Sequence, residues 1–185
     1  MSKTDETAAD SPFVTLLRAQ VREEFTAHQQ YIALAVWFDA HDLQRLAAHF
    51  YRQALEERNH AMMIVQYMLD RDLEVPIPGV GEVRNDFSEV RELIQLALDQ
   101  EKRVTLQIEA LFKAARDDGD FVGEQFVLWF LKEQVEEVSA MSTMLTITER
   151  AGDDLFQIED VLAREQIGDR GASDGSAPKV AGTSV

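Results

Sequence analysis

Residues 71–87 read RDLEVPIPGVGEVRNDF, and this segment decides how the chain folds. Its two prolines and two glycines exclude a regular helix. The segment separates two long stretches, 43–69 and 88–116, whose apolar residues have helical spacing. A connection of about 17 residues reaches about 56 Å when extended, whereas a helix of about 28 residues is about 42 Å long. The connection can therefore run the length of a helix and make the helices on either side parallel.

The other breaks between helical stretches are only a few residues long. Short breaks make consecutive helices antiparallel neighbours. Ser11-Pro12 gives the first helix an N-cap and a proline at its first position, and Ser88 is the expected cap of the third. The sequence thus predicts an all-α four-helix bundle with one long crossover between helices 2 and 3, plus a short fifth C-terminal helix. The predicted helices span residues 12–40, 43–69, 88–116, 121–150 and 153–166.

The composition predicts one folded domain with two polar ends. Residues 11–166 form the predicted domain, residues 1–10 a polar N-terminal head, and residues 167–185 a Gly/Ser/Ala-rich tail expected to be disordered. The first ten residues contain no apolar signal region, and no run approaches the roughly 20 apolar residues of a membrane span. We therefore expect a soluble, cytoplasmic protein.

The charge and the absence of cysteine narrow the function classes. A net charge of −16 and a pI near 4.5 argue against binding to nucleic acid or to anionic membranes, which need a basic face. The chain has no cysteine, which excludes disulfides, thiol nucleophiles and iron–sulfur clusters. Any bound metal must therefore have oxygen and nitrogen ligands.

Each of the four long helices places a carboxylate near the middle of its apolar face. Mid-helix positions meet at one level of a bundle, whichever way each helix points. Four unpaired carboxylates there would be costly, and no lysine or arginine lies on these faces. The converging residues are Glu24, Glu57, Glu101 and Glu137, with His60 and Gln134. This pattern predicts two divalent cations, and carboxylates with one imidazole suit Fe(II), manganese or zinc.

Single members of this set have ordinary alternative explanations. A lone glutamate or glutamine on a helix face is usually solvated or bonded to a partner, and His60 alone is more often a packed histidine than a ligand. Glu57 and His60 are three residues apart, so both can reach one ion from one helix face. The metal interpretation depends on the coincidence of four helices, an arrangement typical of di-iron carboxylate bundles.

Four motifs give the chain its resemblance to bacterial non-haem ferritins. They are REEFTAHQQY (22–31), EERNH (56–60), QE (100–101) and WFLKEQVEE (129–137), and the resemblance covers roughly residues 12–166. It implies a di-iron ferroxidase centre in each subunit, which oxidises Fe(II) to Fe(III) with O₂ or H₂O₂. It also implies a homo-oligomer, a hollow cage of twenty-four subunits that stores ferric mineral.

The resemblance assigns roles to residues of this chain. Glu24, Glu57 and His60 would hold the first iron with Glu57 bridging, and Glu101 and Glu137 would complete the second. The resemblance also implies Gln134 as a metal-binding and catalytic residue beside the second iron, Tyr31 as a catalytic residue next to the centre, and Trp129 as a nearby tryptophan.

Two further assignments also follow from the resemblance. A third iron site would use Glu56, Glu133, Glu136 and Glu137. An iron-access pore at a three-fold axis would be lined by Asp117, Asp118, Asp120 and Glu124. Glutamates beside a helix stripe are usually a solvated face, and acidic turns are common, so both ordinary explanations stay open.

Departures from neighbouring families limit the cofactors and reactions. Haem-binding bacterioferritins carry methionine directly after the bridging glutamate, where this chain has Arg58, and repeat ExxH on the fourth helix, where it has Gln134-x-x-Glu137. The resemblance therefore implies iron without haem. Two alternative functions remain: a non-catalytic cage subunit with vestigial polar core residues, and a di-iron enzyme acting on an organic substrate.

Overall fold

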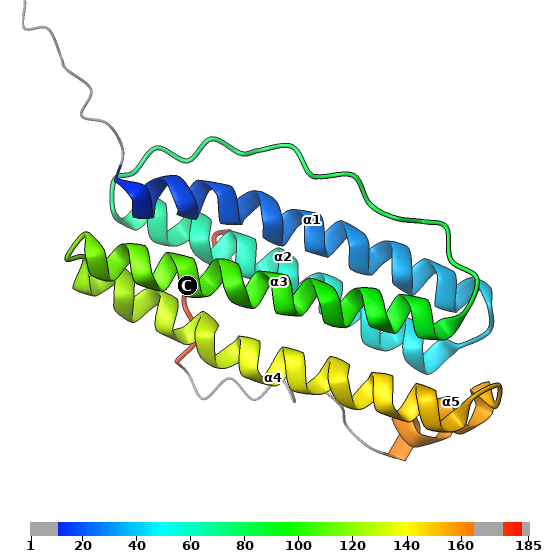
Figure 1. Ribbon diagram of the computed structural model, residues 1–185. Coiled ribbons are helices and arrows are strands. Elements are labelled where there is room, and N and C mark those ends of the chain that lie inside the picture. Colours follow the sequence, from blue (N-terminus) through cyan, green and yellow to red (C-terminus); the bar gives the residue numbers. More distant parts are fainter. Residues whose placement is uncertain (1–10, 165–175, 183–185) are drawn as a thin grey trace, which may run out of the picture.

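The structure is a computed structural model that describes residues 11–164 and 176–182. Four long helices form a bundle, and the α2–α3 connection runs along it from end to end, so α2 and α3 are parallel (Figure 1). The described helices are α1 (Pro12–Ala40), α2 (Gln44–Asp70), α3 (Val90–Asp117), α4 (Phe121–Ala151) and α5 (Leu155–Arg164). This confirms the predicted all-α bundle with one long crossover and a short fifth helix. The head predicted for residues 1–10 lies outside the described residues.

The helix starts agree with the sequence at α1 and differ at α3. The Ser11 hydroxyl oxygen accepts a hydrogen bond from the Val14 N–H at 3.3 Å, and Pro12 begins the helix, as predicted. The cap predicted at Ser88 is wrong, because the N–H and hydroxyl of Ser88 both donate to the Glu92 carboxylate, at 2.8 and 2.9 Å. Helix α3 therefore begins at Val90, without a side-chain cap.

Side chains of α1 hold the crossover against the bundle. The Gly81 N–H donates to Thr26 Oγ1 at 2.8 Å. A Cβ on Gly81 would lie 3.0 Å from Thr26 Cγ2, so glycine permits this close approach. The Gln30 amide donates to the Arg84 carbonyl at 2.9 Å and accepts from the Arg84 N–H at 2.8 Å. These bonds pair a non-helical segment with α1 and satisfy part of its backbone.

The apolar core is divided into two clusters along the bundle axis. One cluster contains buried residues from 31–38, 43–54, 90–98 and 141–144, together with Ile158 of α5. The other contains buried residues from 13–21, 63–68, 104–115 and 127–130. On every long helix the predicted carboxylate falls between the two clusters. The fold therefore places a polar layer between two apolar halves.

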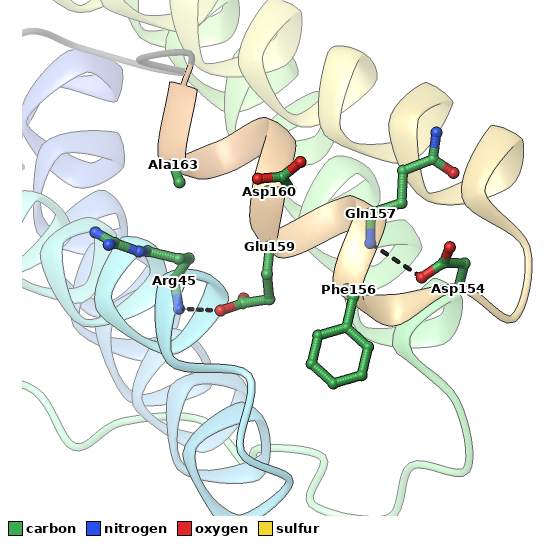
Figure 2. A pocket seen from close by; sticks show the side chains of 7 residues that line it. All are labelled: Arg45, Asp154, Phe156, Gln157, Glu159, Asp160 and Ala163. Atoms are coloured by element: carbon green, nitrogen blue, oxygen red, sulfur yellow. Dashed lines mark hydrogen bonds between the residues drawn. The ribbon is translucent and has the colours of Figure 1, made fainter.

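Helix α5 is attached to the start of α2 by a carboxylate. The N-cap residue of α2, Leu43, makes no side-chain cap bond. Instead Glu159 accepts hydrogen bonds from the backbone N–H groups of Arg45 and Leu46, at 2.8 and 3.0 Å, and Figure 2 shows the first of these. An acceptor at a helix N-terminus satisfies free N–H groups and interacts favourably with the helix dipole. Glu159 therefore caps α2 from a distant part of the chain.

The described part of the C-terminal tail lies against the bundle. The Ala181 N–H donates to the Met62 carbonyl at 3.1 Å. Ala177, Val180 and Ala181 pack against the apolar cluster that begins at Phe13. The position of residues 176–182 thus differs from the disorder expected for the tail, and the rest of that tail lies outside the described residues. None of the described helices is both long enough and apolar enough to cross a membrane.

Candidate metal centre

Three side chains from α1 and α2 converge at the centre of the polar layer. Glu24, Glu57 and His60 each offer a ligand atom, and these atoms all lie within 4.8 Å of one another. His60 Nδ1 is 3.4 Å from Glu57 Oε2. All three side chains are buried, Glu57 completely. Within the described residues no other group of histidines and carboxylates meets at this separation.

The carboxylates of α3 and α4 complete the layer. Glu101 accepts a hydrogen bond from the Tyr31 hydroxyl of α1. Glu137 Oε2 accepts a hydrogen bond from Gln53 Nε2 of α2 at 2.8 Å. Both carboxylates are buried, and the charge of Glu101 raises the pKa of Glu57 and of Glu137. The four carboxylates predicted from the helix faces are therefore neighbours inside one subunit.

No basic side chain balances this negative layer from within the described core. The buried side chains include four glutamates and two histidines, and none of the described lysines and arginines is buried. Several carboxylate oxygens have no hydrogen-bond partner in the described structure: Glu24 Oε2, both oxygens of Glu57, and Glu101 Oε2. Buried carboxylate oxygens are normally paired, because leaving them without partners is costly. The orphaned oxygens are suited to a cation.

Burial raises the pKa of all four carboxyls, and the neighbouring carboxylates add to this effect. The pKa of Glu101 rises to about 7 through burial, although the bond from Tyr31 acts in the opposite direction. Glu24, Glu57 and Glu137 have pKa values well above the usual value, first through burial and second through the charge of a neighbouring glutamate. That neighbour is Glu57 for Glu24, and Glu101 for the other two. Without a cation, the layer therefore retains protons near neutral pH, and a divalent cation would replace them.

Aromatic and polar residues surround the ligand atoms. The His60 ring makes edge contacts with Trp129 and Phe130, each with ring centroids 5.7 Å apart. Gln134 is buried, and its amide oxygen accepts a hydrogen bond from Thr105 Oγ1 at 2.9 Å. A hydrogen bond between Gln134 and Glu101 lowers the pKa of that carboxyl. Gln134, Tyr31 and Trp129 therefore all lie beside the layer, where the resemblance puts them.

The residues predicted for a third iron site are only partly gathered. Glu56 and Glu133 are half-buried, and their charges raise the pKa of Glu137, so both lie near it. Glu136 is exposed, and none of the interactions described for the layer involves it. The structure thus brings Glu56 and Glu133 to the edge of the layer and leaves Glu136 on the surface.

Each acidic residue predicted to line a pore has a partner within the subunit. Asp117 pairs with Lys113, and Glu124 pairs with Arg116. Asp120 accepts from the Gly123 N–H at 2.9 Å and pairs with Arg71 at 3.1 Å, so it caps α4 and links it to α2. Asp118 accepts from the Phe13 N–H at 3.3 Å. These partners reduce the charge that the turn presents to solvent.

Two glutamines make contacts that were not predicted from the sequence. Gln20 Nε2 donates to Glu24 Oε1 at 2.9 Å, and Gln53 donates to Glu137. Both are polar residues on core faces, one helical turn before a predicted ligand, and that position is a signal in the sequence. Gln20 also lines a surface groove between α1 and α3, and Gln134 lines one between α3 and α4.

Comparisons with known proteins cover most of the chain. A family profile described as "Ferritin-like domain" matches residues 14–151. The chain is 58% identical over 179 residues to Ferritin BfrB of Mycolicibacterium smegmatis, and the aligned region covers 97% of this chain and 98% of the relative. It is 56% identical over 162 residues to a Mycobacterium tuberculosis protein named Bacterioferritin BfrB, with 88% and 90% coverage. The Bacterial non-heme ferritin of Staphylococcus aureus is 36% identical over 138 residues, with 75% and 83% coverage.

Solved structures share the same fold. An open pore ferritin from Archaeoglobus fulgidus matches with a TM-score of 0.80 at 23% identity, covering 86% of this chain and 100% of that chain. A structure described as a humanized archaeal ferritin gives the same TM-score at 22% identity, with 88% and 100% coverage. At these identities the likeness concerns the fold alone, and it agrees with the four-helix bundle and short fifth helix.

Proposed function

Because this chain belongs to the ferritin family, we propose that it stores iron after oxidising Fe(II) at a ferroxidase centre inside each subunit. Ferric mineral is then held in the hollow of a cage of twenty-four subunits in the cytoplasm. The observation that carries the proposal is the buried layer of four carboxylates and one imidazole, with no buried lysine or arginine among the described residues. The proposed functional unit is residues 11–166.

The proposed ligands bind two substrate irons per subunit. Glu24 and His60 hold the first ion, Glu101 and Glu137 hold the second, and Glu57 bridges them. Both oxygens of Glu57 lack a hydrogen-bond partner in the described structure, which supports this bridging role. Carboxylate oxygens are hard ligands that favour Fe(III), and a single imidazole leaves the site labile enough for turnover.

Pairing the ions allows two electrons to leave together. Two Fe(II) ions become two Fe(III) ions, and O₂ takes up both electrons and two protons to form H₂O₂. With H₂O₂ as the oxidant, the same two electrons and two protons yield two molecules of water. The one-electron products of these oxidants, superoxide from O₂ and hydroxyl radical from H₂O₂, are thereby avoided.

The proposed centre works without haem. The relatives' names differ on this point, since one contains "Bacterioferritin" and another "non-heme". In this chain Arg58 follows the bridging glutamate and is exposed on α2, where it offers a guanidinium in place of a thioether ligand. The purified protein is expected to show no Soret absorption, even after haem is supplied during expression.

Iron transfer beyond the centre is also part of the proposal. Glu56 and Glu133 border Glu137 and would accept iron leaving toward the cavity, and Glu136 would join them from the surface. The acidic turn formed by Asp117, Asp118, Asp120 and Glu124 would guide Fe(II) inward, provided that assembly rearranges its intramolecular pairs.

One experiment separates the proposed function from its alternatives. Fe(II) is added to the metal-free protein in air, ferric absorbance is followed, and the product is sized. A cage-sized particle with a rapid first phase supports the proposal. A cage that only accelerates slow mineral growth indicates a non-catalytic subunit. A small oligomer with stoichiometric iron and no mineral indicates an enzyme acting on an organic substrate.

A further inference from the structure

We propose that Gln20 and Gln53 are positioning residues that each hold one terminal carboxylate of the centre, Gln20 for the first iron and Gln53 for the second. The inference rests on the proposed di-iron function and deepens it. Neither glutamine was assigned a role from the sequence. The roles follow from which oxygen each amide bonds in the folded bundle.

Gln53 connects the helix of the bridging glutamate to the carboxylate of α4. Its amide nitrogen is 2.8 Å from Glu137 Oε2, and both side chains are buried. Gln53 lies one helical turn before Glu57 on α2. The amide therefore fixes the α4 carboxylate relative to the helix that carries Glu57 and His60.

Gln20 plays the corresponding part on α1. Its amide nitrogen is 2.9 Å from Glu24 Oε1, and the glutamine is 3% exposed. The other oxygen of Glu24 has no hydrogen-bond partner in the described structure. One oxygen is thus held by an amide, and the other is left for an ion.

Of the two remaining carboxylates, Glu101 has a fixed donor and Glu57 differs. Glu101 is held on one oxygen by Tyr31, and its Oε2 is without a partner. Neither oxygen of Glu57, the proposed bridge, accepts a hydrogen bond from an amide or a hydroxyl in the described structure; its close neighbours are His60 Nδ1, 3.4 Å from Oε2, and the Glu24 carboxyl. Three terminal carboxylates therefore each have an amide or hydroxyl donor, and Glu57 has neither kind.

A fixed donor reduces the reorganisation that metal binding requires. A buried carboxylate without a donor can rotate or bond elsewhere, and the ion must then reorient it. Outer-shell partners of this kind typically change metal affinity by about 10–100-fold. Each amide bonds a different carboxylate. Removing one amide should therefore weaken the binding of one ion and leave the binding of the other unchanged.

The test replaces each amide with an isosteric apolar side chain. Gln53→Met and Gln20→Met are compared with Gln100→Met, a matched control whose buried amide nitrogen makes no hydrogen bond in the described structure. Metal-free cages are titrated with Fe(II) without oxygen. Binding is followed by Trp129 fluorescence in a Trp37→Phe background, because Trp129 contacts His60.

The expected result is a crossed pattern. Gln53→Met binds Fe(II) at the Glu24–His60 site as the parent does, and at the Glu101–Glu137 site about 10–100-fold more weakly. Gln20→Met does the reverse. In air, both variants need more Fe(II) for half-maximal oxidation but come within about two-fold of the parent rate at saturation, as expected when positioning alone is lost. Gln100→Met behaves like the parent.

The failures are distinguishable. If the parent binds two ions and both amide variants bind them equally well, the positioning role is overturned and the proposed function stands. If the parent binds no pair of ions, the proposed function fails and the inference fails with it. Should methionine at position 53 prevent assembly, Gln53→Asn, which withdraws the amide by one methylene, must show the same selective loss.

Discussion

The Tyr31 hydroxyl of α1 donates a hydrogen bond to the Glu101 carboxylate of α3 across the middle of the bundle. This bond lowers the pKa of Glu101, but burial outweighs it and the pKa still stands at about 7. Tyr31 therefore helps to keep the α3 carboxylate ionised, and an ionised carboxylate is the form that binds metal.

Replacing Tyr31 with phenylalanine should move the pH dependence of iron oxidation. A hydrogen bond to a charged group contributes about 1.5–3 kcal/mol, which corresponds to an upward pKa shift of about one to two units for Glu101. The pH profile of the initial oxidation rate should shift upward by about one unit. The deficit should be largest near pH 6.5 and should shrink toward pH 9. A deficit of the same size at every pH would contradict this role.

The stability of the metal-free protein should also depend on Glu101. Its folded-state pKa of about 7 lies above the usual value of 4.5, so the folded state binds more protons between these values. The stabilising contribution is therefore fully present below pH 4.5 and is lost as pH rises through 7. Glu101→Gln should flatten the fall in Tm between pH 5.5 and pH 8. Equal slopes for the two proteins would show that this carboxyl is not protonated in the folded state.

A methyl group on Gly123 should destabilise the bundle. A Cβ there would lie 2.5 Å from Phe13 Cε1, within a buried ring contact between α4 and α1. Overpacking typically costs about 1–3 kcal/mol, which exceeds the gain in helix propensity of about 1 kcal/mol at most. Thermal unfolding of Gly123→Ala should show a lower Tm. Gly79→Ala, where the added Cβ meets no atom within 4 Å, is the control and should leave Tm unchanged or slightly higher.

Removing the distant cap of α2 should loosen α5. Glu159→Ala leaves the N–H groups of Arg45 and Leu46 without their acceptor, and loss of a helix cap costs about 0.5–2 kcal/mol. Asp160→Ala is the matched control, since the described bond of that carboxylate is to exposed Arg164. Proteolysis should cut the α5 region faster in Glu159→Ala than in the control. Equal cutting rates would mean that the cap does not hold the helix.

The sequence predicted local and periodic features better than cross-chain ones. Helical spacing located the ends of the four long helices to within about two residues, and loop length predicted the parallel α2–α3 pair. The cap at Ser88 was mispredicted because Glu92 competes for its hydrogen-bonding groups. The Asp120 carboxylate pairs with Arg71, which follows α2. This pair depends on how close α2 and α4 lie, and the apolar spacing within a single helix does not predict that distance.

The same limit applies to the candidate site. Glu57 and the other carboxylates were found because each interrupts an apolar stripe at the same height. Gln53 interrupts a stripe as well, but its partner Glu137 lies on another helix, 84 residues away in the chain. Periodicity identifies which side chains point inward, and the bond between two of them becomes visible only when the helices are placed.

The most direct test of the account is the oxidation of two Fe(II) per subunit by the wild-type protein and by the double variant Glu57→Ala/His60→Ala. Ferric absorbance after rapid mixing with aerated buffer gives the rate, and sizing confirms an intact cage. The account predicts a rapid phase ending at two irons per subunit in the wild type. In the variant, loss of direct ligands should slow this phase by more than the roughly 10–100-fold typical of outer-shell changes. A wild-type rate in the assembled variant would contradict the account.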